Sequence, residues 1–223
     1  MLAPGQRIKA VFIPKALIVR GSRTRIGGTI DSAERDRLNT SYPMILRPGL
    51  ILARNSNNGR WYICWGTTLS ADEAAAQTTL SVATGTGNDG RFDLSDPDSN
   101  ADNIWIVGPG GIPGTQDLGA LSGIAASTIT VTNGLNVMYP SGSYVYRAPA
   151  TTPYDADIAQ GILYENVSVD AGFGADGNVQ ADILTHGIVD SNQLIGSINL
   201  WQGQLMDPTI GNVAHEITFE PPI

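Results

Sequence analysis

Two short stretches match the Gly-x-Gly-x-x-Gly pattern that holds dinucleotides in some enzymes, residues 85–90 and residues 172–177. A dinucleotide site needs these glycines to open a helix, because amides at the helix N-terminus bind the pyrophosphate. Both matches precede sequence that is rich in turns or in β-forming residues. The chain also has 26 glycines, so such matches arise by chance. We therefore predict no nucleotide cofactor.

An acidic stretch, residues 96–102, places oxygen ligands at alternate positions, as calcium loops do. Ala101 stands where the sharp turn of such a loop needs a glycine. Val107 stands where a bidentate glutamate would close the site. The stretch favours a solvated acidic turn, and a calcium site that includes Asp98 stays open as the alternative.

The chain has two histidines, His186 and His215, and neither has a zinc-like spacing with the single cysteine, Cys64. The nucleophile motif Gly-x-Ser-x-Gly is absent, and no acid–base pair with an identifiable partner is evident. We predict that the protein is not an enzyme and uses no cofactor or metal. A hydrolase is the weaker alternative, because it would need a cleft that only a structure reveals. His186 is expected to be hydrogen-bonded at a strand end, and Cys64, between Trp61 and Trp65, to be a small core residue.

Charge divides the chain into two parts. Residues 1–60 hold 11 of the 13 lysines and arginines and three acids, a balance of +8. Residues 61–223 hold two basic residues and 18 acids, a balance of −16, and the two balances sum to the net charge of −8. The first sixty residues are therefore expected to face an acidic partner or to fold back on the acidic body. A solvated basic surface without a partner is the third possibility. Nucleic acid is not expected, because Phe12 and Tyr42 are the only aromatic residues there that could stack on bases.

Alternation of apolar and polar residues predicts strands over residues 162–169 and 179–189, joined as a hairpin by a glycine-rich loop over residues 171–178. A second hairpin is expected from residues 44–53 and 60–65, around the turn at residues 55–59. Residues 31–38 are expected to form a short helix, and Asp190 or Ser191 to cap a helical turn over Leu194 and Ile195. Residues 215–219 alternate like a strand that either closes the main sheet or pairs with a neighbouring subunit.

Residues 69–148 read as a separate small β unit. Four β-forming runs, residues 78–82, 103–107, 127–132 and 143–147, predict an antiparallel sheet or barrel with its own core. Ser70–Glu73 has capping-box spacing before a short alanine-rich turn.

Residues 1–30 lack helical periodicity and hold a β-rich stretch, residues 11–19, that Pro14 interrupts. Proline cannot donate to a β-ladder, so this segment fits an edge strand or an extended arm. The apolar residues 10–19 are too few, and too interrupted by Pro14 and Lys15, for a signal peptide or a membrane span. We expect no membrane partner.

Several of these pieces occur in a suggestive order. Gly161-Ile-Leu163, the hairpin, a second strand ending at His186-Gly187 and a short capped helix follow one another. Upstream lie Tyr42-Pro-Met-Ile-Leu46 and the stretch from Arg60 to Thr68, which ends in Trp65-Gly-Thr-Thr. This order resembles the lambda-type head decoration proteins of tailed bacteriophages, and the resemblance covers about half the chain. The insertion of residues 69–148 and the longer N-terminal segment depart from the family.

The sequence and the resemblance together predict a mainly β chain. A small antiparallel β-sandwich or barrel-like decoration domain with short helices is expected over residues 31–68 and 149–223. An inserted β domain (residues 69–148) and an extended N-terminal arm (residues 1–30) are expected to be added to it.

The resemblance implies a structural protein, made in the host cytoplasm, that stabilises the virion by binding the outer surface of the assembled capsid as a homotrimer. We expect the arm to add a strand to the major capsid protein, with its positive charge favouring an acidic shell. The residues predicted to make this contact are Arg7, Lys9, Val11, Phe12, Ile13, Lys15, Ala16, Ile18, Arg20, Arg23 and Arg25. The insertion is expected to project outward, where it is free to contact host surfaces or glycans. The alternative is a tail or fibre protein or a carbohydrate-binding β module, in which Tyr139, Tyr144 and Tyr146 stack on sugars unless they are core or sheet residues.

Overall fold

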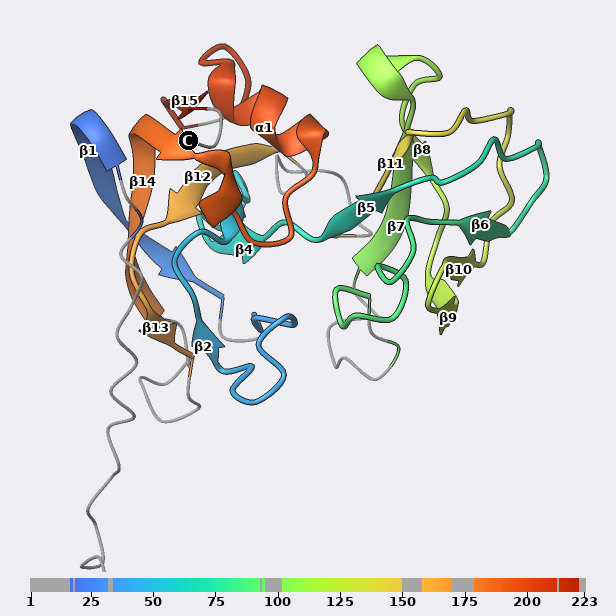
Figure 1. Ribbon diagram of the computed structural model, residues 1–223, viewed down its shortest axis with the longest axis horizontal. Helices are drawn as coiled ribbons and strands as arrows, with labels where there is room; N and C mark the ends of the chain where they lie inside the picture. The colour runs from blue at the N-terminus through green and yellow to red at the C-terminus, as the bar shows by residue number, and fades with distance from the viewer. Residues whose placement is uncertain are drawn as a thin grey trace, which may run out of the picture.

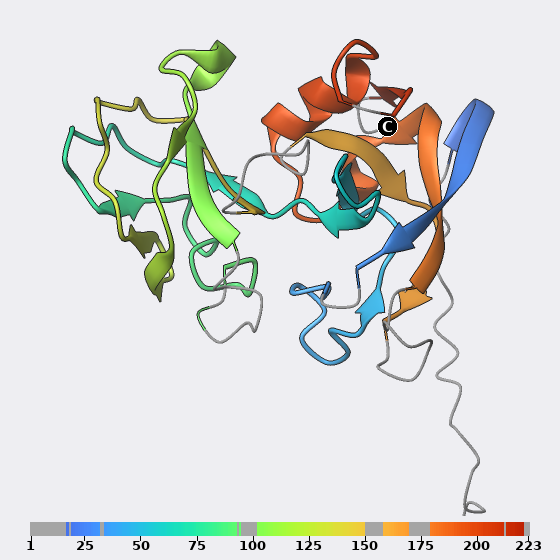
Figure 2. The ribbon, with the colours of Figure 1, turned by 180° about the vertical axis from the view of Figure 1, so that it is seen from behind.

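The computed structural model describes residues 17, 19–31, 34–92, 94, 102–149, 158–169, 179–211 and 213–220. The chain is mainly β, as expected. Figures 1 and 2 show two β units side by side: a body built from both ends of the chain, and an insert built from its middle. No helix in the described ranges is long and apolar enough to cross a membrane.

The body is organised around one six-stranded sheet. In order across the sheet its strands are β1 (Val19–Ile30), β4 (Trp61–Ile63), β3 (Ile51–Arg54), β12 (Ala159–Leu163), β14 (Val179–Asp190) and β15 (Glu216–Glu220). β1 also pairs with β14, so the first five strands close into a ring. Closure removes most free sheet edges, which would otherwise invite unwanted pairing. A small two-stranded sheet of β2 (Ile45–Leu46) and β13 (Val167–Ser168) lies beside the ring.

Several local predictions for the body are confirmed. β3 and β4 form the expected hairpin, and Asn55 Oδ1 accepts bonds from the Asn57 and Asn58 amides in its turn. β12 and β14 are antiparallel neighbours, as expected, but the single strand predicted over residues 162–169 is wrong in part, because β12 ends at Leu163 and Val167–Ser168 form β13, which pairs with β2. Residues 171–178 lie outside the described residues. Asp190 caps the 3₁₀ turn η2 (Ser191–Gln193) by accepting from the Asn192 amide at 2.8 Å, although the turn ends before Leu194 and Ile195, where it was expected. β15 closes the main sheet by pairing in parallel with β14, which decides between the two roles left open for it.

The insert contains two small sheets. One has the order β6 (Thr79–Ser81), β10 (Thr128–Val131), β9 (Leu121–Ala125). The other has the order β5 (Gly66–Thr68), β11 (Tyr144–Pro149), β7 (Asp102–Val107), β8 (Gln116–Asp117). The 3₁₀ turn η1 (Pro109–Gly111) follows β7. Each of the four predicted β runs corresponds to a strand, and their buried side chains, among them Leu80, Ile106, Ile129 and Val145, form a core within residues 69–145.

The body and the insert also share a core. Tyr146 and Val107, on strands β11 and β7 of the insert, pack in the same cluster as Trp201 and Leu205 of α1 (Asn199–Met206). Gly66 lies where the chain passes from body to insert, and a Cβ there would come within 2.9 Å of the Trp201 ring. Trp201 is 1% exposed. The insert is therefore held against α1 by buried side chains as well as by the chain connections.

One predicted helix is wrong. Residues 34–38 form no helix, because Asp36 turns into the body, where it is fully buried and bound by Arg47. The short turn expected after Ser70–Glu73 is present, and the Glu73 carboxylate accepts from the amide of Ser81 across the insert at 2.6 Å. The helix α1 was not predicted, because its apolar residues Trp201 and Leu205 span too few turns to give a periodic signal.

Candidate functional site

The eleven residues predicted to contact a capsid divide into two groups. Arg7, Lys9, Val11, Phe12, Ile13, Lys15, Ala16 and Ile18 lie outside the described residues. Arg20, Arg23 and Arg25 lie on β1, at the side of the molecule away from the insert, and all three are exposed (Figures 1 and 2).

The expectation of an extended arm over residues 1–30 is wrong for residues 19–30. These residues form β1, which pairs antiparallel with β14 from Val19 opposite Val189 to Ile30 opposite Val179. Gly28 makes this pairing possible, because a Cβ there would lie 2.4 Å from Ile183 and 2.5 Å from the Trp61 indole. The backbone of β1 is thus part of this chain's own sheet.

The aromatic ring of Tyr164 contacts two of the three arginines of β1, Arg23 and Arg25. The guanidinium carbons of Arg23 and Arg25 lie 5.4 and 4.7 Å from the centre of the Tyr164 ring, which is within the range of cation–π attraction. Arg23 also donates to the Tyr164 hydroxyl at 2.6 Å, and Arg25 to Asp182 at 2.7 Å. These contacts hold two long, exposed side chains in one place, which lowers the entropy that a partner would have to remove on binding.

The charge of this cluster is only partly neutralised. Arg25 pairs with Asp182, and Arg20 pairs with Glu220 at 3.1 Å. Arg23 contacts a hydroxyl and a ring, and no carboxylate among the described residues. Three arginines therefore face two carboxylates, which leaves the outer face of β1 with one positive charge in excess.

The basic first sixty residues partly fold back on the acidic remainder of the chain, one of the outcomes that the charge division allowed. Arg20 and Arg25 use acids from the C-terminal half, as described. Arg60 pairs with Asp31 at 2.8 Å, and Arg47 pairs with the buried Asp36, so two further arginines are paired within the first sixty residues. These four arginines have intramolecular counter-ions.

The first glycine-rich match, residues 85–90, is structural. Gly87 packs against the β9–β10 turn, where a Cβ would lie 2.1 Å from the Ala125 carbonyl oxygen, and a Cβ at Gly90 would lie 2.6 Å from the Arg37 carbonyl oxygen. Within the described residues no α-helix follows these glycines before Asn199, so no helical amides face the loop. The second match, residues 172–177, lies outside the described residues.

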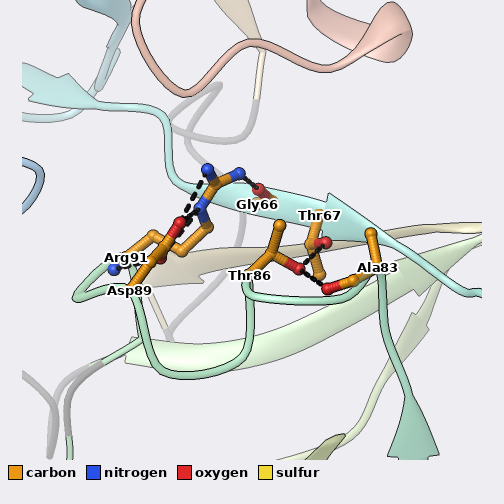
Figure 3. A network of polar contacts seen from close by, with 6 residues as sticks. All are labelled: Gly66, Thr67, Ala83, Thr86, Asp89 and Arg91. Carbon is orange, nitrogen blue, oxygen red and sulfur yellow. Dashed lines mark hydrogen bonds and ion pairs between the residues drawn. The ribbon is translucent and has the colours of Figure 1, made fainter. Parts of the chain in front are cut away.

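A polar network fixes the same loop to the start of the insert (Figure 3). The Arg91 guanidinium binds both carboxylate oxygens of Asp89 and donates to the Gly66 carbonyl oxygen at 2.9 Å. Thr86 donates to the Ala83 carbonyl oxygen at 2.6 Å and lies 2.5 Å from the Thr67 hydroxyl. These polar groups use one another as hydrogen-bond partners. The network therefore holds the loop against β5 and is structural.

The remaining candidates for chemistry are separated in space or not described. The acidic stretch at residues 96–101 lies outside the described residues, and in the described ranges no three His, Cys, Asp or Glu side chains gather as metal ligands would. His186 is hydrogen-bonded to Thr185, as expected, but it lies inside β14, which continues to Asp190, and not at a strand end. His215 is fully buried, with its ring nitrogens 2.7 and 3.0 Å from the carbonyl oxygens of Val213 and Gln204. Cys64 is buried and forms no disulfide, as expected of a small core residue in a chain with a single cysteine.

The predicted sugar-stacking tyrosines are not equivalent. Tyr139 and Tyr146 are 2% and 3% exposed, so they are core residues and cannot stack on a ligand. Burial raises the pKa of the Tyr139 phenol, whose hydroxyl donates to the Gly114 carbonyl oxygen at 2.6 Å. Tyr144 alone of the three is partly exposed.

Sequence reasoning missed Tyr164 and Asp182 as parts of the arginine cluster. Both contacts cross the sheet between residues about 140 to 160 positions apart, and no short motif carries that information. Comparisons with protein-family models, with curated proteins and with solved structures found no match to this chain.

Proposed function

We propose that the protein is a non-enzymatic structural protein of a bacteriophage virion, which binds the outer surface of the assembled capsid and stabilises it. The observation that carries the proposal is the position of the basic residues. β1 presents three ordered arginines on the side away from the insert, and the residues that precede it include Arg7, Lys9 and Lys15.

The shape of the body supports this role. The two stretches that carry the resemblance to head decoration proteins are separated by the insert in sequence. They supply neighbouring strands of one ring, β3 and β4 from the first and β12 and β14 from the second. A closed β body with few free edges suits a protein that must remain folded while it is bound to a shell.

The anchor in this proposal is smaller than the sequence suggested. Residues 1–16 provide a strand that pairs with the major capsid protein, and the arginines of β1 provide a positive surface at its base. A protein that binds only the assembled lattice stabilises that lattice by mass action. The resemblance adds a homotrimer at a symmetry axis of the shell as part of the proposal.

The test is co-sedimentation with empty, expanded capsids of the phage that encodes the chain. The intact protein is expected to sediment with the capsids, more weakly as ionic strength rises, because salt screens the positive surface. A variant without residues 1–16 is expected to stay folded and to lose binding. If the intact protein does not sediment with the capsids, the proposed function is wrong.

A matched control separates strand pairing from charge. In this variant residues 1–16 are kept in composition but placed in shuffled order, so the charge is unchanged and the alternation is lost. We expect weak, salt-sensitive binding from it. Full binding by the shuffled variant would show that residues 1–16 act by charge alone.

A further inference from the structure

A groove of about 330 Å³ lies between α1 and the insert. Its lining includes Gly110 and Tyr144 from the insert, and Asn199, Leu200, Gly203 and Asp207 from α1 and its end. Figures 1 and 2 both show α1 on the side of the body that faces the insert, and β1 on the side away from the insert. The groove is therefore separate from the arginines of β1.

Both walls of the groove are fixed in advance. Alternate residues of β11 share a face, so Tyr144 lies beside Tyr146, which is buried in the core shared with Trp201. On α1, Asn199 and Gly203 are four residues apart and thus share a helix face, and Asp207, the residue that ends the helix, also lines the groove. Because a shared core holds the two walls, the groove exists without a ligand, as is usual for small-molecule sites.

Three polar groups in the groove can each form further hydrogen bonds. The side-chain amide of Asn199 and the hydroxyl of Tyr144 make no hydrogen bond to any described residue. Asp207 uses one carboxylate oxygen, Oδ1, to accept from the Thr209 hydroxyl at 2.6 Å and from its amide at 2.9 Å. The hydrogen bond from the Thr209 hydroxyl, and next the one from the Thr209 amide, lower the pKa of Asp207. The carboxylate is therefore anionic, and its second oxygen, Oδ2, is available as an acceptor.

We propose that this groove binds one pyranose ring of a neutral carbohydrate. The Tyr144 ring offers an apolar surface for the C–H face of a sugar, while the Asp207 carboxylate and the Asn199 amide offer an acceptor and a donor–acceptor pair for its hydroxyls. No cation lies among the described lining residues to offset Asp207, so acidic sugars are disfavoured. The volume is at the lower end of the range for small-molecule sites, which suits a single ring.

Gly203 allows the site to be blocked without weakening the fold. A Cβ at this position would meet nothing within 4 Å, so there is open space beside the helix where it borders the groove. Glycine inside a helix is unfavourable relative to leucine, and Gly203→Leu is expected to keep or slightly raise the melting temperature. The same change places a side chain in the groove.

The experiment is ligand-observed saturation-transfer NMR on the intact protein. The probes are the methyl glycosides of glucose, galactose, mannose and N-acetylglucosamine, with N-acetylneuraminic acid as the acidic comparison. We expect saturation transfer to at least one neutral glycoside, with a Kd in the millimolar range that is typical of a few weak contacts. If none of the four neutral glycosides shows saturation transfer at about 10 mM, or if only the acidic sugar does, the proposal is wrong.

Variants locate the binding. Asp207→Asn and Tyr144→Leu are each expected to weaken binding about tenfold or more, the loss of one good contact. Gly203→Leu is expected to abolish it with the melting temperature retained. Met206→Ala is the matched control, because Met206 is exposed on the same helix and does not line the groove. Equal binding by Gly203→Leu and Met206→Ala would refute the site. Capsid co-sedimentation is unaffected by these variants, so the two proposals fail independently.

Discussion

Asp36 is fully buried, and Arg47 is the residue that makes this burial tolerable. The guanidinium holds both carboxylate oxygens through its Nε and Nη2 groups, and the Asp36 amide donates to the Pro43 carbonyl oxygen at 2.9 Å. A helix over residues 31–38 would have kept this carboxylate near its surface. The local preference of residues 31–38 for a helix is overridden by an ion pair to a residue eleven positions away, which a local reading of the sequence does not detect.

We predict that Arg47→Met lowers the free energy of unfolding by roughly 2–3 kcal/mol. Methionine keeps the apolar stem and leaves the Asp36 carboxylate buried without a partner, while the 36% exposure of the Arg47 side chain keeps the loss below that for a fully buried pair. Urea unfolding measures this. The control is the double variant Asp36→Asn with Arg47→Met, which we expect to recover part of the loss. A double variant less stable than Arg47→Met alone would contradict this account.

At the scale of elements, the alternation in residues 179–189 predicted β14 to within one residue, and the four runs of the insert predicted β6, β7, β10 and β11 but not β5, β8 or β9. Such signals are local, since a strand with one buried face repeats every second residue. What could not be predicted is which strands become neighbours. β1 was assigned to an arm because its partner, β14, begins about 150 residues later and no local pattern names it.

This reassignment of β1 leads to a prediction about truncation. Removing residues 1–16 is expected to leave the melting temperature nearly unchanged, because Leu17 and all of β1 remain. Removing residues 1–30 is expected to prevent folding, because it opens the ring and removes the fully buried Ile30. Circular dichroism and thermal melting of the two variants provide the comparison. A cooperative transition in the variant that begins at residue 31 would show that the ring does not depend on β1.

For the whole molecule, the important contact is the shared core around Trp201. Sequence alone indicated a separate β unit over residues 69–148, but not that Tyr146 and Val107 would leave the core of the insert and pack with α1. That arrangement depends on which face of β11 meets the body. Alternation shows that the strand has two faces, and only the fold shows what each one meets.

We predict that the intact protein unfolds in one calorimetric transition, because neither unit can unfold without exposing the shared core. Trp201→Ala is expected to lower stability by about 3–5 kcal/mol and to split the transition into two. Trp201→Phe keeps an aromatic ring at the junction and serves as the control, with a smaller loss and one transition. A single, unshifted transition in Trp201→Ala would show that the junction is not a core.

The passage of Tyr146 and Val107 into the body has a mechanical consequence. An insert joined only by two strands of polypeptide would swing, and a load on it would be lost in the motion of those linkers. Because side chains of the insert are packed into the body, the insert and the body move as one rigid unit. A pull or twist on its tip is therefore transmitted through α1 and the ring to β1, on the far side of the protein.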